Sequence, residues 1–244
     1  MGLIKYEIMS KETRITEAII LAGGLGTRLR SAVPDLPKCM APVNGKPFIT
    51  YVIDGLKAQG IEKFILALGY KSKAIVDFIT DAYPHLPVQY SLEEEPLGTG
   101  GAIYQACSMA STETVIATNG DTLFHIDIAG LAKSHLDKQA ECTLSLKPMQ
   151  QFSRYGVVEL NAEKAVVSFK EKQFYETGLI NGGVYAINIP AFLGKKFADK
   201  FSFEKEYLET YYTAGRMYGF IQDGYFIDIG IPEDYNRAQT ELKQ

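Results

Sequence analysis

A short apolar run that breaks into a glycine-rich turn constrains this chain most strongly. Residues 18–21 have the pattern of a strand buried on both faces, and glycine fills three of the next positions, 23–26. Successive amides in such a turn can surround one anion, usually a phosphate. Arg28 and Lys38 add two cations close by. The combination suits a triphosphate, and a plain tight turn is the alternative.

Two common phosphate-binding motifs do not fit this turn. The dinucleotide fingerprint needs glycine or alanine at the position of Leu29, so a dehydrogenase is disfavoured. The Walker A motif needs a Gly-Lys pair, and none follows Gly23 or Gly24 at the required distance.

Composition narrows the class of protein. The chain has 244 residues and a formal net charge of −4, which argues against general nucleic-acid binding. No apolar run approaches the length of a membrane span, and the first residues do not resemble a secretory signal. The three widely spaced cysteines predict buried thiols rather than disulfides or a zinc site. We therefore expect a cytoplasmic enzyme with no nucleic-acid or membrane partner.

Apolar runs alternate with helical periodicity over the first half of the chain. Strands are expected at 17–22, 63–68, 88–92, 114–118 and 142–147, with helices near 48–56, 75–82, 102–110 and 128–138. Two later runs, 155–160 and 165–169, predict an antiparallel hairpin. The prediction is an α/β fold: a Rossmann-like, mostly parallel sheet flanked by helices, with antiparallel hairpin additions. Residues 1–17 are read as an N-terminal extension and 18–244 as one domain.

Two further stretches lie where strands end. Residues 93–102 begin with three glutamates, two of which are expected in solvent, and continue into a second glycine-rich run. Asp121 follows a strand and a glycine, a position that suits a hard cation at the carboxyl edge of a sheet. Ordinary turn chemistry is the alternative for Asp121.

Together these stretches resemble the sugar-1-phosphate nucleotidylyltransferases. The resemblance rests on residues 21–29 with Pro37-Lys38, on 96–102, on Gly120-Asp121, on Glu171-Lys172 and on 228–235, in the family's order. One departure is Gln173, where the family often has proline. The resemblance implies a GT-A-like nucleotidyltransferase fold.

The resemblance also implies a role for each matching residue. Catalytic roles fall to Arg28, Lys38 and Asp121, and a Mg²⁺ ion is implied on Asp121 and Asp228. The implied nucleotide contacts are Leu21, Ala22, Gly23, Gly24, Gly26, Thr27, Glu93 at the base edge, Gly98, Thr99 and Asn119. The implied sugar-phosphate contacts are Gly156, Glu171, Lys172 and Asn181.

The implied reaction joins a nucleoside triphosphate to a sugar 1-phosphate and releases pyrophosphate. Residues 18–59, 141–159, 201–205 and 223–235 look most like the D-glycero-α-D-manno-heptose 1-phosphate guanylyltransferases, so GTP and that heptose phosphate are the expected substrates. A mannose 1-phosphate guanylyltransferase is the alternative. A non-catalytic nucleotide or sugar-phosphate binding module is a third reading, disfavoured because Lys38, Asp121 and Asp228 are all present. Homo-oligomerisation stays open.

Overall fold

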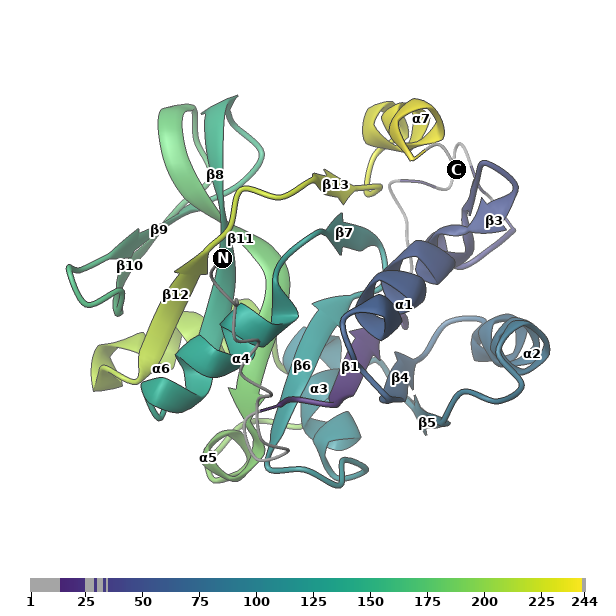
Figure 1. Ribbon diagram of the computed structural model, residues 1–244, viewed down its shortest axis with the longest axis horizontal. Coiled ribbons are helices and arrows are strands. Elements are labelled where there is room, and N and C mark those ends of the chain that lie inside the picture. The colour runs from purple at the N-terminus through teal and green to yellow at the C-terminus, as the bar shows by residue number, and fades with distance from the viewer. Residues whose placement is uncertain (1–13, 25–28, 30–32, 34, 243–244) are drawn as a thin grey trace, which may run out of the picture.

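The centre of the computed structural model, which describes residues 14–24, 29, 33 and 35–242, is a seven-stranded sheet (Figure 1). Its strands are β1 (Glu17–Leu21), β4 (Lys63–Leu68), β5 (Val88–Leu92), β6 (Thr114–Asn119), β8 (Cys142–Phe152), β11 (Tyr175–Asn188) and β12 (Met217–Ile221). Their order across the sheet is β12-β8-β11-β6-β1-β4-β5. Only β11 runs antiparallel to its neighbours within this sheet of described residues. The predicted mostly parallel α/β sheet is confirmed.

Two hydrophobic cores cover the two faces of the sheet, because its inner strands bury both. In β1, Ala18 and Ile20 belong to one core and Ile19 to the other, as the period of two requires. Figure 1 shows α1 and α4 in front of the sheet and α3 behind it. The first core packs α1 (Phe48–Ala58), α2 (Ser72–Ala82), α4 (Ile128–Asp137) and α7 (Pro232–Glu241). The second packs α3 (Gly98–Cys107), α5 (Ile189–Leu193) and the π-helix η4 (Phe203–Leu208), after which come α6 (Glu209–Tyr211) and η5 (Tyr212–Ala214).

Strand β8 is longer than the sequence pattern predicts. The strand expected at 142–147 continues to Phe152, because its outer half pairs with the beginning of β11, where Tyr175 faces Phe152. Between Asn181 and Tyr185 the register of β11 shifts, which makes a bulge that contains Gly182 and Gly183. A side chain on Gly183, at φ +73°, would lie 2.7 Å from Nδ2 of Asn119. Glycine at these positions therefore lets other parts of the chain pack closely against the bulge.

Three short antiparallel ribbons complete the fold. They are β2 (Pro42–Val43) with β3 (Lys46–Pro47), β7 (Thr122–Phe124) with β13 (Phe226–Asp228), and β9 (Val157–Leu160) with β10 (Val166–Lys170). The last is the predicted hairpin. The β7–β13 ribbon joins residues about a hundred positions apart, and it lies near α7 (Figure 1).

Helix α3 begins at Gly98, whereas the expected start was residue 102. Glycine is a poor helix former, so the sequence argued against helix over this run. Here Gly100 N donates to the carbonyl of Phe201 at 3.0 Å, which satisfies one of the amides that a helix start leaves unpaired. Tertiary contact thus overrides the local propensity.

No helix in the described part of the chain is long and apolar enough to cross a membrane. Residue Ile15 is buried and Glu17 opens β1, so the ordered fold reaches slightly before residue 18. The division into a 1–17 extension and one domain over 18–244 stays a prediction, and residues 1–13 lie outside the described residues.

Two glycines within helices give a matched test of this packing. A Cβ on Gly100 would overlap the Phe201 ring, whereas a Cβ on Gly55 of α1 has nothing within 4 Å. Gly100→Ala should lower the free energy of unfolding in urea by about 1–3 kcal/mol through overpacking. Gly55→Ala should raise it by about 0.4–1 kcal/mol, because alanine restricts the unfolded chain. Equal effects of the two substitutions would contradict the close packing on Gly100.

Candidate active site

Two adjoining cavities open beside the carboxyl ends of β1 and β6, the edge at which ligands bind open α/β sheets. The glycine-loop pocket has a volume of about 460 Å³ and includes Gly23, Gly24 and Glu93 in its lining. The lysine pocket has a volume of about 540 Å³ and includes Lys38, Asp121 and Asp228. Thr99 lines both cavities, so they meet at the start of α3.

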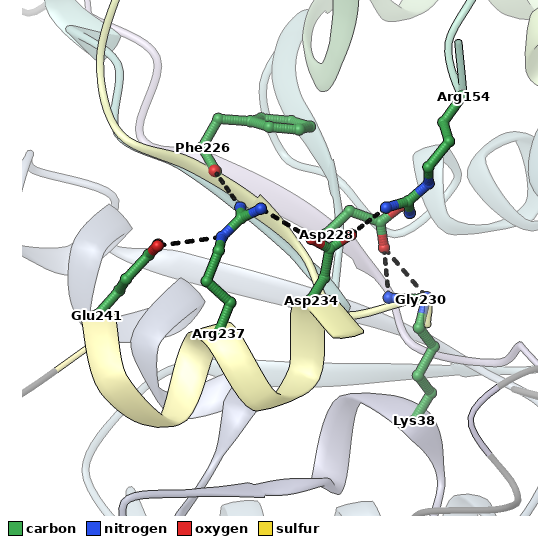
Figure 2. A network of polar contacts seen from close by, with 8 residues as sticks. All are labelled: Lys38, Arg154, Phe226, Asp228, Gly230, Asp234, Arg237 and Glu241. Atoms are coloured by element: carbon green, nitrogen blue, oxygen red, sulfur yellow. Dashed lines mark hydrogen bonds and ion pairs between the residues drawn. The ribbon is translucent and has the colours of Figure 1, made fainter. Parts of the chain in front are cut away.

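Lys38 lies between two carboxylates in the lysine pocket. Its Nζ is 2.5 Å from Oδ2 of Asp121 and 3.3 Å from Oδ1 of Asp228. The lysine side chain is only 11% exposed, while the aspartates are 30% and 23% exposed and therefore still open to the cavity. Figure 2 shows the Lys38 ammonium and the Gly230 amide both directed at Asp228, and that amide donates at 2.8 Å.

Backbone pairing brings these three side chains together. Lys38 opens the 3-10 turn η3 (Lys38–Met40), and Asp121 lies in the turn between β6 and β7. Asp228 ends β13 and pairs across the ribbon with Thr122, the residue after Asp121. The amide of Ile229 also donates to the carbonyl of Asp121 at 3.1 Å. A carboxylate from the middle of the chain and one from near residue 230 are therefore fixed beside the same ammonium.

At two glycines around this cluster, neighbouring atoms lie so close to the backbone that a side chain would displace them. A Cβ on Gly120 would lie 2.9 Å from the carbonyl oxygen of Leu21. A Cβ on Gly230 would lie 2.8 Å from Oδ1 of Asp228 and 2.9 Å from Nζ of Lys38. Any larger residue would push these groups aside.

The glycine-loop pocket gathers most of the predicted nucleotide contacts that the structure describes. Leu21, Gly23, Gly24, Glu93, Gly98 and Thr99 line it. Oε2 of Glu93 accepts from the amide of Leu97 at 2.9 Å, and a Cβ on Gly23 would lie 2.8 Å from Oε1. Glu94 and Glu95 are exposed, as expected.

Some predicted nucleotide contacts lie elsewhere. Ala22 is buried behind the loop, where its amide donates to the carbonyl of Ala67 at 2.9 Å. Asn119 lines the lysine pocket, beside the bulge of β11. Gly26, Thr27 and Arg28 lie outside the described residues.

The lysine pocket brings together all four predicted sugar-phosphate contacts. Gly156, Glu171, Lys172 and Asn181 line it, with the two charged residues on its exposed rim. The Asn181 amide is also used by the fold: Nδ2 donates to the Tyr185 hydroxyl at 2.8 Å, and Oδ1 accepts from Gly183 N at 3.1 Å. Asn181 therefore holds the bulge that shapes this wall.

The Asp121–Asp228 pair is the donor set in this pocket that fits a hard divalent cation. Both carboxylates already converge on one positive charge, the Lys38 ammonium, and both are accessible from the cavity. Among the described residues, no group of three or more His, Cys, Asp or Glu side chains could hold a metal ion. A cation here would therefore need further oxygen ligands from water or from a substrate.

Sequence reasoning missed several residues of the lysine pocket. Tyr155, Glu204, Lys205 and Glu209 also line it. Burial, together with the Asp228 carboxylate, raises the pKa of Tyr155 to about 12, so its hydroxyl stays protonated. Glu204 and Lys205 lie in a run that resembles the heptose enzymes, but that resemblance implied no place for them in the cavity.

A second missed feature ties the pocket to α7. The carboxylate of Asp234 contacts Arg154 and also accepts from Arg237 at 2.8 Å, as Figure 2 shows. Asp234, in the first turn of α7, therefore anchors the loop before Tyr155. A local charge pattern could not reveal a partner 80 positions away.

The comparison with known proteins agrees with this geometry. Residues 17–244 match the family described as nucleotidyl transferase. The chain belongs to the nucleotidyl transferase family.

Similar proteins carry more specific names. The D-glycero-α-D-manno-heptose 1-phosphate guanylyltransferase of Aneurinibacillus thermoaerophilus is 48% identical over 93% of this chain and 98% of that protein. The crystal structure of HddC from Yersinia pseudotuberculosis complexed with GMP-PN has a TM-score of 0.85 and 38% identity, over 94% of this chain and all of that one. The mannose-1-phosphate guanylyltransferase of Mycobacterium tuberculosis is 33% identical, and the match covers 94% of this chain but only 65% of the relative.

Thiol reactivity tests the burial of the three cysteines. Cys39, Cys107 and Cys142 are unpaired and buried, and burial raises the pKa of Cys39 and of Cys107 to about 12. We expect no reaction of the native protein with Ellman's reagent at pH 8, and three thiols per chain in guanidinium. A thiol that reacts rapidly in the native protein would contradict the burial of these residues.

Proposed function

We propose that this chain transfers a guanylyl group from GTP to D-glycero-α-D-manno-heptose 1-phosphate, releasing pyrophosphate. The observation that carries the proposal is the Lys38–Asp121–Asp228 cluster in the lysine pocket, which adjoins the glycine-loop pocket at Thr99. Support also comes from the 48% identical relative of that name and from the HddC structure with GMP-PN. One cavity takes the nucleotide and the other takes the sugar phosphate.

The reaction needs no nucleophilic side chain. An oxygen of the sugar phosphate attacks the α-phosphorus of GTP, and the bond from that phosphorus to the bridging oxygen breaks. Pyrophosphate carries away the electron pair. Such a step depends on positioning and on neutralising charge, since the attacking phosphate is already an anion.

Lys38 holds the reacting phosphates in this proposal. Its ammonium, paired with Asp121 and Asp228, lies in the wall of the lysine pocket next to the glycine loop. On the acceptor side Lys172 binds the sugar phosphate, while Glu171 and Asn181 bind hydroxyls. The role of Arg28 at the triphosphate remains a prediction.

We assign Mg²⁺ as the cation of the Asp121–Asp228 pair. When bound, it supplies Lewis-acid polarisation of the α-phosphate and a template for the two phosphates. The two aspartates would hold it, and the β7–β13 ribbon keeps their carboxylates side by side. The three buried, unpaired cysteines suit a reducing compartment, which supports the proposed cytoplasmic location.

Removing the ammonium tests the role of Lys38. Lys38→Met should lower kcat by ~100-fold or more, the typical loss when one charge-stabilising donor is removed. Lys73→Met is the control, because Lys73 is 86% exposed and pairs with Asp77 within α2. Turnover is measured by pyrophosphate release, with the unfolding transition as a check on folding. Near-normal turnover in Lys38→Met would remove Lys38 from the mechanism.

Substrate identity is tested by crossing nucleotides with sugar phosphates. GTP, UTP, CTP, ATP and dTTP are each combined with heptose, mannose, glucose and N-acetylglucosamine 1-phosphates in the presence of Mg²⁺. We expect pyrophosphate from GTP with the heptose phosphate, and none after EDTA treatment until Mg²⁺ is restored. Release with mannose 1-phosphate alone would favour the mannose enzyme. Silence in every combination would favour a binding module.

A further inference from the structure

The glycine run at the start of α3 packs against a distant segment of the chain, residues 199–203. Gly98, at φ +74°, would place a Cβ 2.5 Å from the carbonyl oxygen of Phe201. The amide of Phe201 donates to the carbonyl of Leu97 at 3.0 Å, and its carbonyl accepts from Gly100 N at 3.0 Å. The loop that lines the glycine-loop pocket is thereby joined to the segment that leads into η4.

Thr99 is the side chain at this junction. Its hydroxyl accepts from the amide of Phe203 at 2.9 Å and donates to Oε2 of Glu204 at 2.9 Å. The hydroxyl of Ser202 donates to the same Oε2 at 3.0 Å. Thr99 lines both cavities and Glu204 lines the lysine pocket. One carboxylate oxygen is thus fixed by two hydroxyls, one of which belongs to the nucleotide side.

The other oxygen of Glu204, Oε1, accepts no hydrogen bond from the described residues. Glu204 is half-buried and belongs to the wall of the lysine pocket, so a ligand in that cavity can reach it. A carboxylate oxygen accepts hydrogen bonds and repels phosphate. The partner that suits Oε1 is a sugar hydroxyl.

Other carboxylates lie on the same side of the cavity. Burial and the charges of Glu171 and Glu204 raise the pKa of Glu209, so these three acidic groups are near one another. Lys172 and Lys205, next in sequence to Glu171 and Glu204, also line the cavity, so this side combines hydrogen-bond acceptors for sugar hydroxyls with ammonium groups for the sugar phosphate. The ammonium of Lys38, on the aspartate side, is suited to phosphate.

Building on the proposed function, we propose that Glu204 orients the acceptor sugar by accepting a hydrogen bond from one of its hydroxyls. Thr99 is a positioning residue, because it sets the carboxylate of Glu204 through a direct hydrogen bond. The loop that lines the nucleotide cavity thereby also sets the geometry of the sugar cavity.

Steady-state kinetics with purified full-length protein test this assignment. Glu204→Gln should raise KM for the heptose phosphate roughly 10-fold or more, as for a lost hydrogen bond to a charged group. The Kd of a non-hydrolysable GTP analogue should change less than twofold. Thr99→Val should raise the same KM, and the double variant should be no worse than the poorer single variant, because both changes disable one hydroxyl contact.

Glu206→Gln is the matched control, because it shows whether loosening of η4 alone raises the KM. Glu206 is exposed in the same turn, and its Oε2 accepts from the Ser202 amide at 2.6 Å, yet it does not line the cavity. Its KM should stay near the wild-type value. An equal rise in Glu206→Gln would overturn the inference, since the effect would then be structural.

The remaining outcomes separate the two proposals. Unchanged KM in Glu204→Gln, with normal turnover of the wild-type protein, overturns the role of Glu204 and leaves the proposed function intact. Additive losses in the double variant overturn the positioning role of Thr99. A wild-type protein that releases no pyrophosphate from these substrates overturns the proposed function, and this inference with it.

Discussion

The contact of one lysine with two aspartates organises the functional end of this protein. Lys38, Asp121 and Asp228 come from three distant parts of the sequence. Their mutual contact identifies the site more specifically than any single sequence motif does. Two carboxylates held side by side repel each other, so they need a cation between them. In the structure that cation is the Lys38 ammonium, and in the proposed reaction the aspartates share their charge with Mg²⁺ while Lys38 holds phosphate. The β7–β13 ribbon aligns the two aspartates, and Gly120 and Gly230 leave room for the chain to pack closely around the contact.

The sheet topology explains why two cavities adjoin at this end of the described structure. Strands β1, β4 and β5 are parallel, so the loops that follow them gather at one edge and build the glycine-loop pocket. The long antiparallel strand β11, with its bulge at Gly182 and Gly183, bounds the second cavity. The carboxylates line the second cavity, which adjoins the first at Thr99. A transfer between two bound substrates needs this arrangement.

The sequence predicted the sheet well because its inner strands are buried on both faces and have unambiguous apolar runs. The ranges 63–68 and 88–92 agree with β4 and β5. The prediction was wrong at the start of α3, because the carbonyl of Phe201, a distant residue, accepts from Gly100 N and so caps a glycine-rich turn. The strand predicted at 142–147 is also shorter than β8, because pairing with the distant strand β11 sets the length of β8.

The candidate site was predictable to the extent that its residues lie in motifs. Lys38, Asp121 and Asp228 were identified, and the structure brings them together. Asn119 was expected at the nucleotide but lines the lysine pocket, since the bulge of β11 comes to it. Glu204 and the Arg154–Asp234 contact were missed because they depend on long-range packing that leaves no local pattern. The assigned roles of all these residues remain to be tested.

The most direct test of the central claim is a crystal structure with a non-hydrolysable GTP analogue and Mn²⁺ in place of Mg²⁺, located by its anomalous signal. The account predicts a metal peak ligated by both Asp121 and Asp228, with the guanosine in the glycine-loop pocket and the α-phosphate beside Lys38. A metal bound away from these aspartates, with Lys38 still held between them and no phosphate nearby, would contradict it.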